Sequence, residues 1–283
     1  MSRLIVPRAT LAVAASLILL ICSSAASRAQ DVAVQIADKR TDWHGFDRYH
    51  FSIAQRPAYI VVPKTAATGK PWIWRARFPD FHFEMDVELL KQGFHVAYID
   101  VAGLFGSPQA MEIGDAFYDD VTQHRGLAKR PALEGVSRGG LFVYNWAARH
   151  PERVACIYCD TPVLDFKSWP GGKGTGIGSA GTWQQCLKVY GLTEAAALGY
   201  KSLPLNHAAV IAKHNIPLLH IVSESDTVVP PVENTYELQK RLKELNHELP
   251  VISVPQGTEK SHGHHFTHPD PQRVVNFIAK HAK

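Results

Sequence analysis

The sequence predicts an α/β fold in which a mostly parallel central sheet has helices on both faces. Two observations support this prediction. Short apolar runs alternate along the chain with longer, helix-like stretches, as buried parallel strands alternate with the helices that cover them. One of these runs, residues 131–136, leads through Gly-Val-Ser-Arg-Gly into a Gly/Ala-rich stretch, residues 139–149, that is typical of a helix packed against a sheet.

The first 29 residues resemble a secretory signal peptide rather than part of the fold. Arg3 and Arg8 precede an apolar run at residues 11–21, and small residues follow up to an expected cleavage site after Ala29. The apolar run is short for a transmembrane span. We therefore expect a secreted or periplasmic protein without stable membrane association once residues 1–29 are removed; a retained anchor is the alternative.

Charge gives no indication of a nucleic-acid partner. The formal net charge of the 283 residues is +4, and three of the 30 lysines and arginines but none of the 26 acids lie in residues 1–29, which leaves +1. Residues 30–283 have a length that suits one α/β domain with a modest insertion.

Three cysteines follow the leader: Cys156, Cys159 and Cys186. An odd number leaves at least one of them unpaired within the chain. Cys156 and Cys159 have the spacing of a redox motif, but they lie inside a strand-like run instead of opening a helix. Buried thiols are therefore expected in preference to redox chemistry.

The order of elements can be followed along the chain. Strands are expected at residues 49–53, 58–62, 71–78, 95–101, 131–136, 153–160, 216–222 and 250–254. Helices are expected at residues 84–92, 107–124, 139–149, 183–190, 193–200, 231–245 and 271–280. Residues 161 to about 207 break the alternation and are expected to form an insertion after the sixth strand. Its Gly-rich part does not fit a phosphate loop, because Lys173 is followed by glycine.

The Gly135-Val-Ser137-Arg-Gly139 turn is a candidate nucleophile site. A sharp strand-to-helix turn presents a serine hydroxyl at the edge of a sheet, and small residues on both sides let strand and helix pass closely. The alternative is a surface Gly-Ser turn, for which polar flanking residues would be expected instead of apolar ones.

A serine nucleophile needs a base to take its proton and an acid to orient that base. Asp226 directly follows a predicted strand, and His264 lies between the last strand and the last helix. Asp160, at the end of the sixth strand, is an alternative acid. His262, His265 and His268 surround His264 in the sequence; four histidines could bind zinc instead, but no acidic or cysteine ligands accompany them.

The chain resembles the α/β-hydrolase superfamily in three motifs: Gly-Val-Ser137-Arg-Gly, Asp226-Thr-Val-Val-Pro and Gly-His264. In its general sequence character it is most similar to secreted bacterial esterase-like members. The resemblance implies a serine hydrolase that needs no cofactor or metal and cleaves carboxylic esters through an acyl-enzyme. Ser137, Asp226 and His264 then form the catalytic triad in the order that this fold uses.

One feature departs from the superfamily pattern. No His-Gly-Gly-Gly oxyanion motif follows the third strand, where Trp74-Arg-Ala-Arg-Phe78 stands instead. One oxyanion donor is expected from the backbone N–H of Arg138, and the second from the backbone near Ala76 or Arg77. Glucuronoyl esterases resemble this chain in carrying an arginine after the serine, where it helps to bind the oxyanion; an Arg138 side chain turned into solvent is the alternative.

Cations and tryptophans in the predicted loops point to a substrate class. Both kinds of side chain are expected around the carboxyl edge of the sheet: Arg75, Arg77, Arg138, Lys167 and Lys173, with Trp74, Trp169 and Trp183. Cations suit carboxylates, and indoles suit sugar faces. We therefore expect a small or carbohydrate-linked ester as the substrate. A noncatalytic glycan-binding module, a peptidase and a thioesterase remain alternatives, and each of these side chains could instead be an ordinary loop or core residue.

Overall fold

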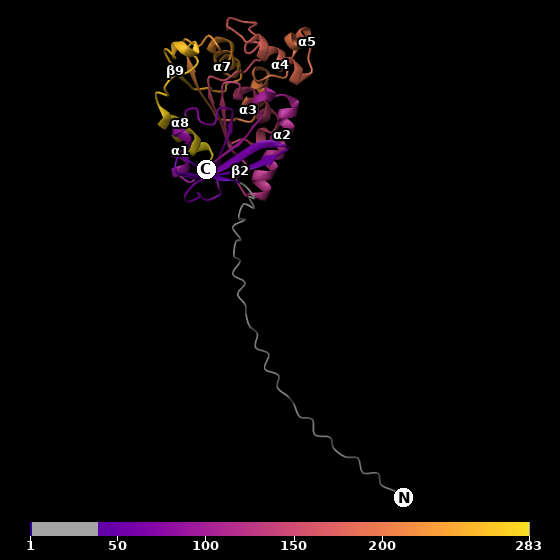
Figure 1. Ribbon diagram of the computed structural model, residues 1–283, viewed down its shortest axis with the longest axis vertical. Helices are drawn as coiled ribbons and strands as arrows, with labels where there is room; N and C mark the ends of the chain where they lie inside the picture. Colours follow the sequence, from indigo (N-terminus) through magenta and orange to yellow (C-terminus); the bar gives the residue numbers. More distant parts are fainter. Residues whose placement is uncertain (2–38, 283) are drawn as a thin grey trace. The chain divides into compact units, whose positions relative to one another are not determined.

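The computed structural model describes residue 1 and residues 39–282, so the predicted signal peptide lies almost wholly outside the described residues. In residues 39–282, nine strands form one sheet in the order β1-β2-β3-β5-β4-β6-β7-β8-β9 (Figure 1). The strands are β1 (Arg40–Trp43), β2 (Phe46–Ile53), β3 (Arg56–Val62), β4 (Trp72–Ala76), β5 (His95–Ile99), β6 (Ala132–Val136), β7 (Cys156–Asp160), β8 (Leu218–Ser223) and β9 (Val251–Val254). The pairs β1–β2, β2–β3 and β3–β5 are antiparallel, and all other neighbouring pairs are parallel. The sheet is therefore mostly parallel, as predicted.

Helices connect the parallel strands. They are α1 (Glu84–Lys91), α2 (Pro108–Asp119), α3 (Gly139–Arg149), α4 (Ala180–Tyr190), α5 (Glu194–Gly199), α6 (Ala208–Lys213), α7 (Thr235–Glu244) and α8 (Pro271–His281). Short 3₁₀ or π turns are η1 (Ala102–Leu104), η2 (Asp120–His124), η3 (Pro151–Arg153), η4 (Pro204–His207), η5 (Pro231–Glu233) and η6 (Glu259–Ser261).

Two apolar cores lie on the two faces of the sheet. Phe117 of α2, Trp146 of α3 and Leu238 of α7 belong to the core on one face. Leu89 of α1 and Ile278 of α8 belong to the core on the other face. Every residue of β4, β6, β7 and β8 is buried, because both faces of these central strands are covered. This arrangement confirms the prediction of helices on both faces.

Most predicted elements are present, with three informative differences. The strand β1 was not predicted because its residues, Arg40–Trp43, contain no apolar run. The helix α6 was not predicted either, because its six residues are too few to show a helical period. The strand β4 ends at Ala76 rather than at residue 78, because Arg77 and Phe78 adopt positive φ angles of 72° and 47° that no strand allows.

The insertion after β7 carries α4 and α5 and has a small core of its own. Val163, Phe166 and Trp183 pack there with Leu141, a residue in the first turn of α3. The insertion therefore lies over the helix that follows Ser137. Figure 1 shows α4 and α5 at the same end of the described part as α7 and β9.

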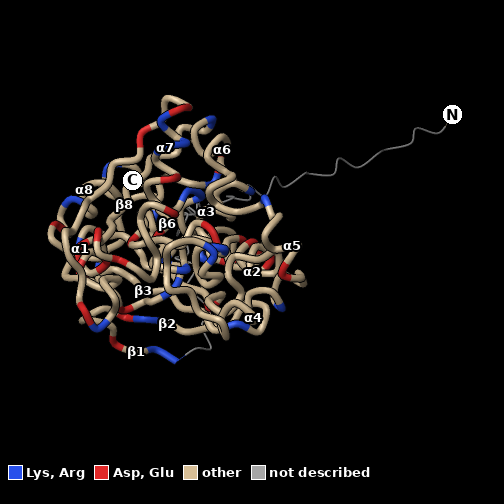
Figure 2. Tube along the Cα trace, turned by 90° about the horizontal axis from the view of Figure 1, so that it is seen from above, with Lys and Arg blue, Asp and Glu red and all other residues tan. Residues whose placement is uncertain are grey.

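The three cysteines after the leader are buried, as the sequence predicted. Basic and acidic residues are interspersed along the trace of the described residues (Figure 2). Cys156, Cys159 and Cys186 are buried and free, and burial raises the pKa of each thiol, to about 12 for Cys186. None of the helices in residues 39–282 combines the length and apolar character needed to cross a bilayer.

Candidate active site

Ser137 lies in the predicted turn between β6 and α3. Its φ angle is 50°, a left-handed conformation that is uncommon for a residue other than glycine. Three backbone hydrogen bonds hold it: Ser137 N–H donates to the Asp160 carbonyl at 2.9 Å, and its own carbonyl accepts from Gly140 at 3.0 Å and Val163 at 2.9 Å. The strand–turn–helix predicted from the sequence is therefore present, and its strained residue is the serine.

Two glycines make this turn possible. A Cβ on Gly135 would stand 2.9 Å from the Val143 side chain, and one on Gly139 would collide with the carbonyl oxygen of Ala76. Real Cβ atoms do not approach other atoms this closely. The close passage of α3 over the ends of β4 and β6 therefore requires glycine at both positions.

His264 and Asp226 join Ser137 in one chain of hydrogen bonds. The Nε2 atom of His264 lies 3.0 Å from Ser137 Oγ, and its Nδ1 atom lies 2.6 Å from Asp226 Oδ2. The second oxygen of Asp226 accepts from the backbone N–H groups of Val228 at 2.8 Å and Val229 at 2.9 Å. The three side chains come from positions far apart in the sequence, and only 7%, 7% and 3% of Ser137, His264 and Asp226 are exposed.

Close backbone packing fixes the loop of His264 against the loop of Asp226. Gly263 has a φ angle of 81°, and a Cβ there would collide with the carbonyl of Ser225. The N–H of Thr227 donates to the His262 carbonyl at 3.0 Å. The two loops meet at the carboxyl ends of β8 and β9, which places the imidazole beside the carboxylate.

Comparison with solved structures agrees with this architecture. An acylaminoacyl peptidase of Pyrococcus horikoshii superposes with a TM-score of 0.61 at 17% identity over 86% of this chain. An esterase of Pyrococcus furiosus superposes with a TM-score of 0.54 at 16% identity, over 88% of this chain and 95% of the esterase. This chain has the α/β-hydrolase fold. The likeness was expected from the turn at Ser137 and from the order of Ser137, Asp226 and His264.

The α/β-hydrolase neighbours differ in length. A puromycin-hydrolyzing peptidase of Mycobacterium tuberculosis superposes with a TM-score of 0.63 at 15% identity, over 88% of this chain and 40% of the peptidase. The chain likewise spans 44% of the acylaminoacyl peptidase. No protein-family model and no curated protein matches this sequence.

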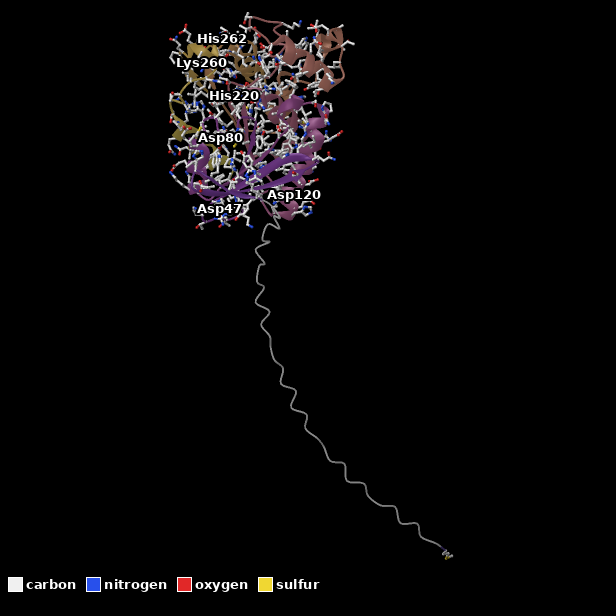
Figure 3. All side chains as sticks on the ribbon, viewed as in Figure 1. Asp47, Asp80, Asp120, His220, Lys260 and His262 are labelled. Atoms are coloured by element: carbon white, nitrogen blue, oxygen red, sulfur yellow. The ribbon has the colours of Figure 1, made fainter. Side chains whose placement is uncertain are left out.

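Of the four clustered histidines, His264 alone contacts the serine. His262 and His265 are exposed, and buried His268 lies 3.2 Å from the Tyr158 hydroxyl. Figure 3 places His262 at the end of the described part that carries α4 and α5, opposite Asp47. Within residues 39–282, no group of three or more histidine, cysteine or acidic side chains is arranged to hold a metal ion.

The alternative acid, Asp160, has a different partner. Its Oδ2 atom lies 2.5 Å from Nδ1 of His82, and the Nε2 atom of His82 lies 2.8 Å from the carbonyl oxygen of Phe266. Both partners are acceptors, so this arrangement favours a protonated imidazole in which both ring nitrogens donate. Burial opposes this charge, but the hydrogen bond and negative charge of Asp160 outweigh it, so the pKa of His82 is raised.

His82 was not identified from the sequence. It lies in the loop after β4, 78 residues before Asp160, and no local pattern links the two positions. In the structure it joins the end of β7 to the loop that carries His264, because Phe266 follows His264 by two residues. A histidine in the loop after β4, at the carboxyl edge of the sheet, is the one sequence signal that could have suggested it.

Two arginines lie beside the serine, as expected. Among the described residues, the backbone N–H groups of Arg77 and Arg138 have no hydrogen-bond acceptor, which leaves them free to bind an oxyanion. The Arg138 guanidinium lies 5.2 Å from the centre of the Trp169 ring and 5.5 Å from that of Phe105. Because Arg138 directly follows Ser137, this contact places the half-buried Trp169 next to the serine turn.

The prediction that Trp74 and Arg75 bind the substrate is wrong. Arg75 and Trp74 are not in a loop at the site but inside β4, where both are almost completely buried. Trp74 packs against Trp146 of α3, with ring centres 4.8 Å apart. On the other face of the sheet, Arg75 pairs with Asp86 and lies 3.0 Å from a carboxyl oxygen of Glu134.

The physical reason for this error is the position of β4 in the sheet. Because β4 lies between β5 and β6 and is covered on both faces, successive side chains enter the two cores instead of solvent. The other predicted cations, Lys167 and Lys173, lie in the insertion together with Trp183. Lys167 pairs with Asp165 at 3.3 Å, and Lys173 pairs with Glu194. The buried indole of Trp183 also donates to Glu194, at 2.6 Å.

Proposed function

We propose that this protein is a serine hydrolase that cleaves carboxylic esters through an acyl-enzyme on Ser137. The observation that carries the proposal is the buried hydrogen-bonded chain from Ser137 through His264 to Asp226. Nucleophile, base and orienting acid are all within hydrogen-bond reach of one another.

The hydrogen bonds determine the direction of proton transfer. The Asp226 carboxylate can only accept, so the neutral imidazole carries its proton on Nδ1 and accepts at Nε2. Ser137 Oγ attacks the ester carbonyl and its proton passes to Nε2 of His264. The imidazolium then returns this proton to the alkoxide oxygen of the leaving alcohol. A water molecule repeats the two steps on the acyl-enzyme and releases the acid.

The free backbone N–H groups of Arg138 and Arg77 supply the oxyanion donors in this mechanism. They flank the serine from α3 and from the end of β4, and the left-handed φ of Arg77 turns the chain at that point. A well-placed donor of this kind contributes about 3–4 kcal/mol of transition-state stabilisation. The missing His-Gly-Gly-Gly motif is thereby replaced by the turn at Arg77 and Phe78.

The two peptidases superpose with the higher TM-scores, and the choice of an ester over a peptide bond is supported only by how much of each neighbour this chain covers. The esterase of Pyrococcus furiosus matches over 95% of its length, whereas less than half of each of the two peptidases is covered. A peptidase or thioesterase is the nearest variant. A noncatalytic glycan-binding module would not require the aligned Ser137, His264 and Asp226 side chains.

The finer proposal is an extracytoplasmic enzyme that acts on carbohydrate-linked esters. The leader-like residues 1–29 support export. The half-buried Trp169 beside the serine turn supports a sugar, because an indole offers a flat apolar face with a polar edge. Acetylated sugars should therefore be hydrolysed faster than long-chain lipid esters.

Labelling with a fluorophosphonate tests the central proposal, because only an activated serine reacts. The wild-type protein should be labelled and should hydrolyse short esters. Ser137→Ala should lose labelling and about 10⁶-fold in kcat, with an unchanged circular dichroism spectrum. Ser202→Ala, which removes an exposed serine in the loop before η4, is the matched control and should behave as the wild type. Equal labelling of Ser137→Ala and the wild type would contradict the proposal.

A further inference from the structure

Arg77 and Arg138 differ from the other cations of the predicted set because no acidic side chain pairs with either of them. The other cations of the predicted set are paired with acids: Arg75 with Asp86, Lys167 with Asp165 and Lys173 with Glu194. Neither Arg77 nor Arg138 forms an ion pair or a side-chain hydrogen bond with another described residue, and the buried Nε atom of Arg77 has no partner.

Aromatic rings position both guanidinium groups. The Arg77 guanidinium lies 4.4 Å from the centre of the Phe78 ring, and that of Arg138 lies within 5.5 Å of the ring centres of Phe105 and Trp169. Such contacts use the face of the guanidinium and leave its in-plane N–H donors free. The two groups are thus held in place with their hydrogen-bonding edges unoccupied.

The two arginines also lie close to each other and to the serine. The position of a Cβ on Gly139 is 3.3 Å from the Cβ of Arg77, and Arg138 directly follows Ser137. Both arginines line a cavity of about 10 Å³, which has room for about one oxygen atom. Burial and the charge of Arg77 lower the pKa of Arg138 to about 10, the direction expected for two neighbouring cations.

We propose that Arg77 and Arg138 form a carboxylate-binding subsite and that the substrate is an ester with a free carboxylate close to its scissile bond. This inference rests on the proposed esterase function. Two guanidinium forks can each donate to one carboxylate, and such charge-assisted bonds are stronger than neutral ones. The carboxylate neutralises the repulsion between the arginines and holds the ester carbonyl beside Ser137.

Matched esters test the subsite on both parts of the substrate. On the acyl side, 4-nitrophenyl hemisuccinate is compared with its neutral methyl succinate analogue. On the alcohol side, 4-acetoxybenzoate is compared with its methyl ester. In one of the two pairs, kcat/KM of the wild type should be at least about tenfold higher for the carboxylate, as expected for one charge-assisted interaction. The pair that shows the preference identifies the part of the substrate that carries the carboxylate.

Variants separate this subsite from oxyanion binding. Arg77→Gln and Arg138→Gln should each reduce the preference to within about twofold, chiefly by raising KM for the anionic ester. Arg153→Gln is the matched control: its guanidinium also stacks on an aromatic ring, 4.8 Å from the centre of Tyr118, but it lies before the amino end of β7. This control should keep the preference.

Three outcomes would overturn the inference. Equal kcat/KM within both pairs in the wild type, or a preference unchanged in both arginine variants, would exclude the carboxylate subsite while the esterase function stands. An equal loss of kcat on anionic and neutral esters would assign the arginines to the oxyanion alone. Failure of the wild type to hydrolyse any of the four esters would contradict the proposed function and this inference with it.

Discussion

Replacing Arg75 by methionine separates a structural role of this residue from the substrate-binding role that the sequence suggested. Its side chain is completely buried, bonds to Asp86 and to the carbonyl oxygens of Phe78 and Phe81, and lies 3.0 Å from a carboxyl oxygen of Glu134. Methionine has a similar length but supplies no donor or charge. The variant therefore leaves two acids and two carbonyl groups buried without their cation.

The expected loss of stability is large. Removing one partner of a buried ion pair costs about 3–5 kcal/mol, whereas a whole domain is stable by about 5–15 kcal/mol. With a urea dependence of about 2–3 kcal/mol per molar, the unfolding midpoint of Arg75→Met should fall by about 1–2.5 M. Urea unfolding followed by tryptophan fluorescence measures this shift.

Arg77→Met is the matched control for this experiment. Arg77 lies two residues further along the chain, is half-buried and has no acidic partner, so its loss should change stability by less than about 1 kcal/mol. An Arg75→Met protein with wild-type stability and a raised KM would refute the structural assignment. It would return Arg75 to the substrate site.

Neutralising the two acids next to Arg75, Glu134 and Asp86, should change the stability of the protein to different extents. Burial raises the pKa of Glu134 well above its usual range; the charge of Arg75 opposes this increase and that of Asp86 adds to it. Burial raises the pKa of Asp86 as well, but the charge of Arg75 acts most strongly on Asp86, so we expect Glu134 to be the protonated member of the group. Glu134→Gln should change stability at neutral pH by less than about 1.5 kcal/mol, whereas Asp86→Asn should cost about 3–5 kcal/mol because it removes the charge that balances Arg75.

The pH dependence of the free energy of unfolding gives a second test of the protonation of Glu134. The folded protein holds a proton on Glu134 that the unfolded chain releases above the ordinary glutamate pKa of 4.5. This contribution to stability is fully present below that pKa and is lost as the pH rises toward the raised folded value, at about 1.4 kcal/mol per pH unit. Glu134→Gln should lack this slope, and an identical pH dependence in both proteins would show that Glu134 is charged.

Three further predictions follow from the site. Asp226→Asn should lower kcat by about 10⁴-fold, because the amide no longer holds His264 in the accepting tautomer, and Asp160→Asn should lower it far less; the reverse ranking in steady-state kinetics would make Asp160 the acid. His264→Ala should abolish ester hydrolysis while exposed His262→Ala remains active, and the opposite result would exchange their roles. The pKa of His82 is raised in the folded protein, so His82→Gln should lower the free energy of unfolding most below about pH 6.5, where the imidazole is fully charged. The loss should become smaller as the pH rises through the folded pKa. An equal loss of unfolding free energy at pH 6 and pH 9 would exclude a charged His82.

The sequence alone determined the layered fold and the turn at Ser137. Continuous apolar runs such as Ala132–Val136 are typical of strands covered on both faces, and the flanking glycines indicate a turn that larger residues would block. These features depend on neighbours within a few residues, so a single sequence can predict them. The order of Ser137, Asp226 and His264 added the expected positions of base and acid.

Only the tertiary structure decided which polar side chains meet. Arg75 and Arg77 are two residues apart and chemically alike, yet one closes a buried ion cluster and the other faces the site, because β4 ends between them at Ala76. The contact between His82 and Asp160 joins positions 78 residues apart. Contacts of this kind depend on where separate loops converge at the sheet edge. Local periodicity carries no information about that convergence, because it is set by the packing of the whole domain.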